Sequence, residues 1–171
     1  YNSTYAWGIL VKGSVAAPAD YNSIENVSVV LPLMSSGSSN VTCIVASAST
    51  TTASTTGNVA TGLKIWNCNT YGGSYGIYLF GNNTSGQGSP NAEVKNCKIR
   101  NCYNLGINGY AMSSLLIQGN QLLNVGTGAT QNTTYSSLNQ IQLQYCDTFT
   151  VKGNSFTGAL GGSAVLYQYC D

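Results

Sequence analysis

The four residues Gln144-Tyr145-Cys146-Asp147 recur unchanged as Gln168-Tyr169-Cys170-Asp171, and this repeat decides the fold. The period of the repeat is 24 (168 − 144), and the match widens until residues 141–147 align with residues 165–171. Self-similarity at a period of roughly 20 to 50 residues is typical of a solenoid, in which one unit cannot bury its apolar face without a neighbour. The repeat therefore predicts a stack of similar units.

The same frame extends toward the N-terminus. Residues 77–82 and 107–112 resemble the first segment of a unit, and a second strand-like segment follows at 94–99, 117–122 and 151–156, with a looser copy at 65–70. The offset between the starts of the two segments is 10 in the units beginning at Ile107 and Ile141 (117 − 107 and 151 − 141). The offset is 17 in the unit beginning at Ile77 (94 − 77), because of an insertion rich in Gly, Asn and Ser.

Each segment alternates apolar and polar residues, which predicts β-strands with one buried face. Gly, Asn and Ser separate the segments and favour turns. Stacking the units in register predicts parallel strands and ladders of identical side chains, such as Asn120 over Asn154 and Tyr145 over Tyr169. No apolar stripe at helical spacing is sustained, so helices are not expected.

The pattern Gly-Ile-x-Leu, followed about ten residues later by Ile-x-Gly-Asn-x-apolar, resembles the pectin-lyase-like family of right-handed parallel β-helices. The resemblance covers roughly residues 62–171. It implies an all-β, right-handed parallel β-helix of about seven rungs. That family includes lyases, hydrolases, phage tailspikes and non-catalytic surface proteins, so the resemblance implies a fold and leaves the activity open.

We interpret residues 1–171 as a single β-helix domain, with residues 1–23 as an irregular N-terminal segment or cap and residues 24–171 as rungs. Loop insertions are expected near 82–90 and 126–137. In the N-terminal part, residues 8–13, 24–34 and 41–48 read as strands, the second stopped at Pro32. Residues 49–58 read either as a loop or as a strand with a hydroxyl ladder.

Only 6% of the residues are charged and the net charge is +1, so neither nucleic acid nor an anionic membrane is an expected partner. No apolar run is long enough for a membrane span. Six cysteines with abundant Ser, Thr and Asn favour an extracellular or cell-surface location. Tyr1 is not a translation start, so we expect a processed chain or a fragment. Glycosylation sequons occur at Asn2, Asn26, Asn40, Asn82, Asn83 and Asn132.

The aligned units place Cys68 and Cys97 at one ladder position, and Cys146 and Cys170 at another. Neighbouring strands are ~4.8 Å apart, within the Cα separation that a disulfide tolerates. Two bonds, Cys68–Cys97 and Cys146–Cys170, are therefore predicted, which leaves Cys43 and Cys102 as a third pair by elimination. The alternative is a ladder of free, buried thiols that pack as small apolar groups. No metal is expected, because His and Cys-x-x-Cys motifs are absent.

Catalytic groups are scarce in this sequence. The absence of His excludes a Ser-His-Asp or Cys-His arrangement. The resemblance implies a carboxylate cluster, often with calcium, plus Arg or Lys as base. Asp147 and Asp171 are the only acids in register, and their alternative role is in Asx-turns. We therefore lean against an enzyme and predict no cofactor.

Glycan binding is the alternative function. Lys95 and Lys152 share an outward position with Gln118 between them, which is either a basic stripe for an acidic glycan or a solvated face. Aromatic side chains could stack on sugar rings if they lie outside, and belong to the core if they lie inside. These are Trp66, Tyr78, Phe80, Tyr110, Tyr145 and Tyr169.

The last unit stops after its first strand, which leaves backbone donors and acceptors open to another chain. The spacing from Val165 through Asp171, and from Tyr1 to Val11 of a following copy, is 17 (6 + 11), equal to the Ile77-to-Val94 spacing. We therefore expect head-to-tail stacking into a surface filament through Val11, Val165, Tyr167, Tyr169 and Asp171. The alternatives are a glycan-binding or glycan-cleaving module and a fragment of a larger adhesin.

Overall fold

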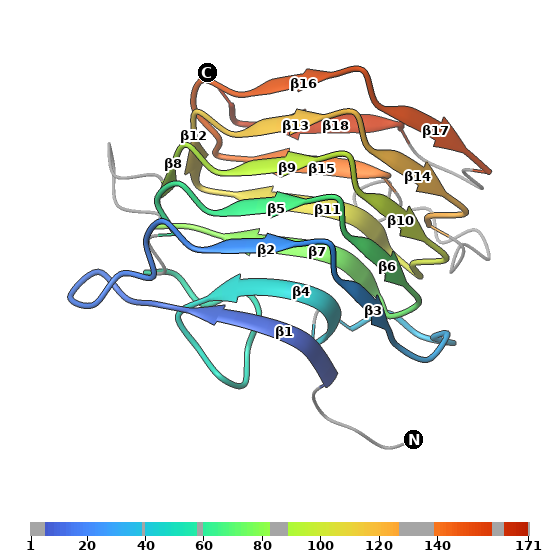
Figure 1. Ribbon diagram of the computed structural model, residues 1–171, viewed down its shortest axis with the longest axis horizontal. Helices are drawn as coiled ribbons and strands as arrows, with labels where there is room; N and C mark the ends of the chain where they lie inside the picture. The colour runs from blue at the N-terminus through green and yellow to red at the C-terminus, as the bar shows by residue number, and fades with distance from the viewer. Residues whose placement is uncertain are drawn as a thin grey trace.

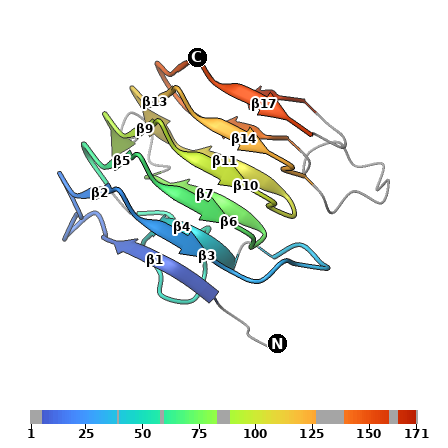
Figure 2. The same ribbon diagram turned by 45° about the vertical axis from the view of Figure 1, so that its right-hand side comes forward.

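The computed structural model describes residues 6–38, 40–57, 60–82, 89–126, 139–158 and 163–170. Within them the protein is all-β, and every strand pairing is parallel. This confirms the predicted class of stacked parallel sheets. The chain forms three large sheets and one small one, which Figures 1 and 2 show as a stack that rises from the N-terminus to the C-terminus.

Sheet A has six strands: β1 (Ala6–Lys12), β4 (Val41–Ser47), β7 (Tyr75–Phe80), β11 (Leu105–Tyr110), β15 (Ile141–Gln144) and β18 (Val165–Gln168). Sheet B has five: β2 (Ser23–Glu25), β5 (Lys64–Trp66), β9 (Glu93–Lys95), β13 (Leu116–Gln118) and β16 (Thr150–Lys152). Sheet C also has five: β3 (Ser28–Val30), β6 (Asn69–Tyr71), β10 (Lys98–Arg100), β14 (Gln121–Leu123) and β17 (Ser155–Thr157). The small sheet pairs β8 (Ser89–Pro90) with β12 (Met112–Ser113).

The chain visits the large sheets in a fixed order. After β1, it passes from sheet B to sheet C to sheet A, and it repeats this round five times among the described strands. Sheet B faces the viewer in Figure 1, with sheet C at its right and sheet A behind. Each round stacks on the previous one, so residues of equivalent position form columns along the stack.

The strands of sheets B and C are short because a left-handed residue follows each strand of sheet B and each strand of sheet C except β3. Between the two sheets the left-handed positions are Asn26, Asn67, Asn96, Gly119 and Gly153, with φ between 53° and 69°. Asn and Gly tolerate this conformation better than other residues. The corner at Asn26 corrects the prediction of one strand over residues 24–34, because the backbone turns there and the segment forms β2 and β3 instead.

The inward positions of the three sheets form one apolar core. Ile65, Val94, Ile99 and Ile117 have no exposed surface, and neither have Ile44, Ile77, Ile107 and Ile141 of sheet A. The predicted strands at 8–13 and 41–48 are confirmed as β1 and β4. The described part of residues 49–58 carries no strand, which favours the loop interpretation. Of the two predicted insertions, near 82–90 and 126–137, residues 83–88 and 127–137 lie outside the described residues.

Candidate functional site

The two ends of the stack carry the exposed apolar side chains. Among the described residues, every exposed large apolar side chain lies in 15–33 or 145–169: Val15, Tyr21, Val30, Leu33, Tyr145, Tyr167 and Tyr169. The first group surrounds β2 and β3, and the second lies around β15 to β18. In Figure 1, β2 and β3 are the lowest strands of sheets B and C, and β16 and β17 are the highest strands of these sheets. Exposed apolar groups gathered at specific places favour an interaction surface there.

The core columns lose burial at the C-terminal end in all three sheets and at the N-terminal end in sheet A, whereas Ile24 and Val29, the first inward residues of sheets B and C, are buried. In sheet A the inward column is Ile9, Ile44, Ile77, Ile107, Ile141 and Val165. The four middle side chains are fully buried, whereas Ile9 and Val165 are only partly buried. Val151 and Phe156, the last inward residues of sheets B and C, are partly buried too.

The residues predicted for assembly mostly map to these ends. Val11 lies in β1, Val165 and Tyr167 lie in β18, and Tyr169 follows β18, while Asp171 lies outside the described residues. The spacing argument behind the prediction is wrong, however. Val11 pairs with Ala46 in sheet A, whereas the strand expected after β18 belongs to sheet B. The sequence similarity of residues 11–14 to 151–154 therefore reflects no equivalent position.

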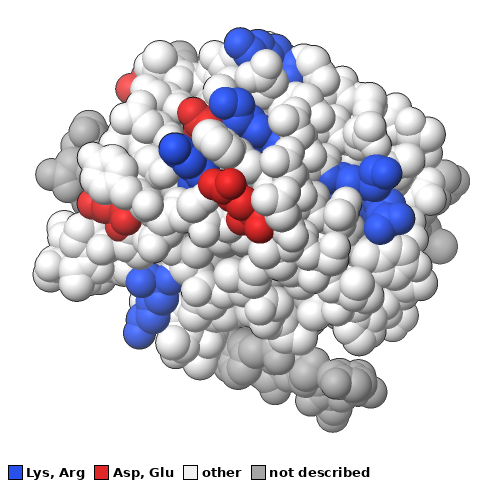
Figure 3. Space-filling view, in the orientation of Figure 1, with Lys and Arg blue, Asp and Glu red and all other residues white. Residues whose placement is uncertain are grey.

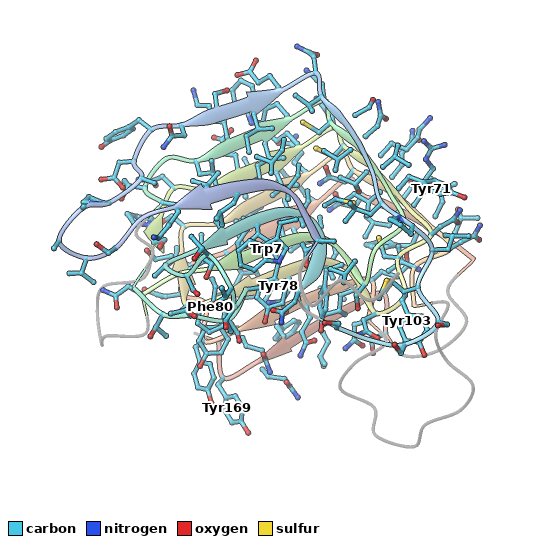
Figure 4. The ribbon with its side chains drawn as sticks, turned by 90° about the horizontal axis from the view of Figure 1, so that it is seen from below. Trp7, Tyr71, Tyr78, Phe80, Tyr103 and Tyr169 are labelled. Atoms are coloured by element: carbon cyan, nitrogen blue, oxygen red, sulfur yellow. The ribbon has the colours of Figure 1, made fainter. Side chains whose placement is uncertain are left out.

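An aromatic ladder runs along the outer side of sheet A. The rings of Phe80 and Tyr110 stack with centroids 4.3 Å apart, Tyr110 meets Tyr145 edge to face at 5.2 Å, and Tyr145 stacks on Tyr169 at 5.1 Å. This confirms the predicted ladder of Tyr145 over Tyr169. Figure 4 shows Phe80 and Tyr169 on the same side of the stack, away from Tyr71. Tyr145 and Tyr169 are 48% and 75% exposed, so the ladder becomes accessible at the C-terminal end.

The tyrosines at the buried end of this ladder are poor acid–base groups. Burial raises the pKa of Tyr75, to which Asn104 donates a side-chain hydrogen bond. Burial also raises the pKa of Tyr78, whose ring meets that of Tyr75 at 5.0 Å. Phenols with raised pKa values stay protonated at neutral pH, so these side chains contribute ring surface and hydrogen bonds rather than proton transfer.

Trp66 forms a second candidate site, on the outer face of sheet B. Lys64 Nζ and Lys95 Nζ lie 4.8 and 4.9 Å from the centroid of its ring. Trp66, Asn67, Lys95 and Asn96 line a shallow hollow of about 160 Å³. The indole Nε1 is buried and has no hydrogen-bond partner among the described residues. A ring flanked by cations and amides can hold a polar, flat ligand.

The predicted outward column of Lys95, Gln118 and Lys152 is confirmed by the strand register. The column begins with Glu25 and Trp66, so it is not uniformly basic. Figure 3 shows acidic and basic side chains intermixed on this face. Lys95 forms an ion pair with Glu93, its Nζ lying 3.1 Å from Oε2. Because the charges are mixed, this face offers no basic stripe for an anionic polymer.

One column of side chains ties successive rounds together at the corner between sheets B and C. The thiols of Cys68 and Cys97 donate to the carbonyls of Ile24 and Ile65, at 3.3 and 3.4 Å. In the next two rounds the amides of Asn120 and Asn154 donate to the carbonyls of Val94 and Ile117, both at 3.0 Å. Each carbonyl belongs to the preceding round, so Cys and Asn perform the same task in this column.

The structure corrects the prediction of three disulfides, because all six cysteines are free thiols. The predicted pairs were Cys68–Cys97, Cys146–Cys170 and Cys43–Cys102. The ladder positions were right, and Cys146 stacks against Cys170, whose sulfur lies 3.4 Å from the Cys146 backbone nitrogen. In-register parallel strands hold equivalent Cβ atoms at about the ~4.8 Å strand spacing, wider than the Cβ separation of a typical disulfide. The thiols of Cys68, Cys97, Cys146 and Cys170 instead donate to backbone carbonyls of the preceding round.

The buried thiols are not nucleophiles. Burial raises the pKa of Cys43, Cys97 and Cys146 to about 12. Burial also raises the pKa of Cys102 well above its ordinary value, and the nearby Cys43 thiol adds to the effect. Because the thiolate is the reactive form, these groups are inert at neutral pH.

The weak catalytic candidates do not form a site that the structure describes. Asp147 is exposed in the turn after β15, and its carboxylate accepts a hydrogen bond from Thr148 Oγ1 at 3.0 Å. This contact fits the turn interpretation. Asp171 lies outside the described residues. No group of three or more potential metal-ligating side chains gathers within the described ranges.

The glycosylation sequons differ in accessibility. Asn26 is exposed in the corner between β2 and β3, and Asn40 is partly buried. Asn82 is only 4% exposed, so its side chain is inaccessible to a glycosylating enzyme in the folded protein. Asn2, Asn83 and Asn132 lie outside the described residues.

No helix with the length and apolarity of a membrane span occurs in the part of the chain that the structure describes. No family model matches this chain, and no curated protein or solved structure matches it.

The sequence reasoning missed the cluster around Trp66, although a signal for it was present. Lys64 lies directly before the predicted segment 65–70 and two residues from Trp66, and residues two apart in a strand project from the same face. Lys95 falls beside Trp66 once the units are aligned. Phe149, whose ring lies 5.8 Å from that of Tyr167, was also missed, because it lies in the turn before β16.

Proposed function

We propose that this protein is a structural subunit of an extracellular or cell-surface filament, and that copies stack end to end. The proposal includes the closed, right-handed solenoid and the pectin-lyase-like architecture expected from the sequence repeat, with the five described rounds in place of the expected seven or so rungs. The observation that carries it is the gathering of exposed large apolar side chains at the two ends of the stack. The described strands of one copy would then continue into those of the next.

The composition supports a packed, repeating assembly. Few charges must lose their water when two ends meet, because only 6% of the residues are charged. Scarce catalytic groups and protonated thiols favour a structural role over a catalytic one.

Electron microscopy of the purified native chain, without added ligand, tests this proposal. Unbranched filaments that lengthen with protein concentration are the expected result. Particles that stay dispersed at all concentrations would contradict it.

A matched pair of variants identifies the ends as the contact surface. Val151→Lys places a charge in the last inward position of sheet B and should abolish filaments. Thr150→Lys adds the same charge to the same strand, at an exposed outward position, and should leave filaments intact. If the two variants form filaments equally well, the inward position of Val151 does not take part in the contact between copies.

A second candidate function, glycan binding, rests on the Trp66 hollow. Its ring, flanking lysines and asparagines offer both a stacking platform and hydrogen-bond donors to a sugar. Quenching of tryptophan fluorescence by oligosaccharides, lost in Trp66→Ala and retained in Trp7→Phe, would support it. Equal responses of the two variants, or no response of the native chain to acidic and neutral oligosaccharides, would exclude this site.

A further inference from the structure

The outer face of sheet C carries positive charge that no acidic side chain on the described part of that face balances. Lys98 and Arg100 both project from this face, because they flank the buried Ile99 in β10. The outward positions of the other strands hold uncharged residues: Ser28, Val30, Asn69, Tyr71, Gln121, Leu123, Ser155 and Thr157. Figure 3 shows basic atoms on the side of sheet C, at the right, with no acidic atoms beside them in this view.

The charges of sheet B are balanced, which sets the two faces apart. The outward positions of sheet B include Glu25 and Glu93, and Glu93 forms an ion pair with Lys95. Within the described part of the chain, neither the Lys98 nor the Arg100 side chain forms an ion pair or a hydrogen bond. The two cations stand two residues apart, about 6.6 Å along the strand, so they repel each other. An anion bound between them would remove this repulsion.

Arg100 is held in place by its neighbour in the preceding round. Tyr71 pairs with Arg100 in the strand register, and the guanidinium carbon lies 5.7 Å from the centroid of the Tyr71 ring. A guanidinium packed on a ring loses less freedom when it binds an anion than a free one does. Its Nε is buried and has no hydrogen-bond partner among the described residues. Buried polar atoms usually have a protein, water or ion partner, so Arg100 lacks contacts that a ligand can supply nearby.

We propose that this face binds a sulfate or phosphate ester of a polysaccharide, with the ester group held between Lys98 and Arg100. Such an ester has three terminal oxygens that accept hydrogen bonds. The planar guanidinium can donate to two of them in parallel, and the ammonium of Lys98 can donate to the third. A carboxylate has two oxygens, which one guanidinium already occupies, so it makes less use of the second cation. This inference goes beyond the proposed function and does not depend on it.

The residues around the two cations suit the sugar rings of such a ligand. Asn69 and Gln121 lie on either side of the lysine in one column, and both are exposed. Tyr71 and Leu123 lie on either side of the arginine in the other column, and both are partly buried. Sugar hydroxyls would therefore meet amides on one side of the ester group, and the apolar parts of the rings would meet aromatic and aliphatic surface on the other.

The site lies within the stack, over β6, β10 and β14, whereas the surfaces proposed for stacking lie at its two ends. Binding can therefore be measured whether or not copies assemble. Loss of binding would leave the filament proposal intact, and an absence of filaments would leave this site intact.

Dextran oligosaccharides of equal length test the proposal, because one backbone can carry different groups. The probes are unmodified dextran and its carboxymethyl, sulfate and phosphate derivatives, the last three at equal substitution. Calorimetry at low ionic strength should show the sulfate or the phosphate derivative binding about tenfold or more tighter than the carboxymethyl derivative. The tighter of the two identifies the ester. Equal affinities for all three anionic probes would overturn the proposed geometry, and an absence of binding would overturn the site.

Matched variants locate the contact. Lys98→Gln should weaken binding of the preferred ester by about tenfold or more, and should leave thermal unfolding unchanged because Lys98 is exposed. Lys152→Gln removes the same charge from an exposed position of sheet B and should leave the affinity unchanged. Arg100→Lys keeps the charge but loses the planar fork, so it should reduce the preference for the ester over the carboxymethyl derivative. Equal losses in Lys98→Gln and Lys152→Gln would mean that net charge governs binding, and would overturn the proposal.

Discussion

The side-chain oxygen of Asn154 accepts two hydrogen bonds from Asn120, one from its backbone N–H and one from its Nδ2, both at 2.9 Å. Asn120 in turn accepts from the backbone N–H of Cys97 at 2.8 Å. The ladder that the repeat predicts is thus a chain of amides linking three rounds. At the corner between sheets B and C, these side-chain amides bond to backbone N–H and carbonyl groups of the neighbouring rounds.

Removing one amide from this chain should destabilise the fold. Asn120→Ala leaves the Cys97 N–H and the Val94 carbonyl without their partner in a buried place, and each unsatisfied group costs about 1–3 kcal/mol. We expect a loss of about 2–5 kcal/mol in the free energy of unfolding, measured by denaturant titration. Gln121→Ala, at the neighbouring exposed position, should change it by less than about 0.5 kcal/mol. Similar losses in both variants would refute the amide chain.

The open ends of the core predict a gradient of mutational cost along one column. Ile107→Ala removes a fully buried side chain in the middle of sheet A and should cost about 2–5 kcal/mol. Ile9→Ala makes the same change at the partly buried end and should cost less than half as much in the monomer. Denaturant titration at a concentration below assembly measures both. Equal costs would mean that the N-terminal end is closed.

Thiol accessibility should follow the position of each cysteine. A thiol-specific reagent at neutral pH should modify Cys170, which is partly exposed, and spare the other five, which are buried. Unfolding in denaturant without reductant should release six reactive thiols. Recovery of only four or two would establish disulfides.

Alkaline pH should destabilise the fold through the buried thiols. The pKa of Cys43, Cys97 and Cys146 is about 12 in the folded protein, against 9.0 for an ordinary thiol. Between these values the unfolded chain releases protons that the folded chain keeps. Stability is therefore fully present below pH 9 and is lost as the pH rises toward 12, by about 1.4 kcal/mol per pH unit for each thiol.

Cys43→Ala provides the control for that prediction. It removes one of the three thiols, so the dependence of the unfolding free energy on pH above 9 should become shallower by about the slope of one thiol, about 1.4 kcal/mol per pH unit. An unchanged slope in the variant would assign the alkaline loss to other groups.

Much of the register could be predicted from the sequence. Tyr145 over Tyr169, Cys146 over Cys170 and Asn120 over Asn154 follow from aligning the repeat, because a shift by one residue would turn every apolar side chain outward. The columns are thus set by local pattern. What the side chains do in those columns was less predictable: Cys68 and Cys97 stack as expected, but donate to carbonyls instead of bonding to each other.

The predictions from the sequence were wrong where the local pattern of residues does not determine the sheet to which a segment belongs. Residues 24–34 read as one strand from their β-branched and apolar residues, yet Asn26 takes a left-handed backbone conformation that turns the chain into sheet C. Residues 11–14 resemble 151–154, yet they occupy different sheets. Neither difference is visible in a short segment, because the sheet to which a strand belongs depends on the neighbouring round that covers it.

The sequence by itself determined an all-β chain of stacked parallel strands, the residues that share each column, and the scarcity of catalytic groups. These properties follow from the alternation of apolar and polar residues, the repeat and the composition, which can be read from short segments or from residue counts. Only the tertiary structure decided that the described strands divide into three sheets, that Glu25 and Lys152 lie in one column, and that two lysines lie over the Trp66 ring. Those relationships join residues distant in the chain, and the order in which the rounds stack creates them.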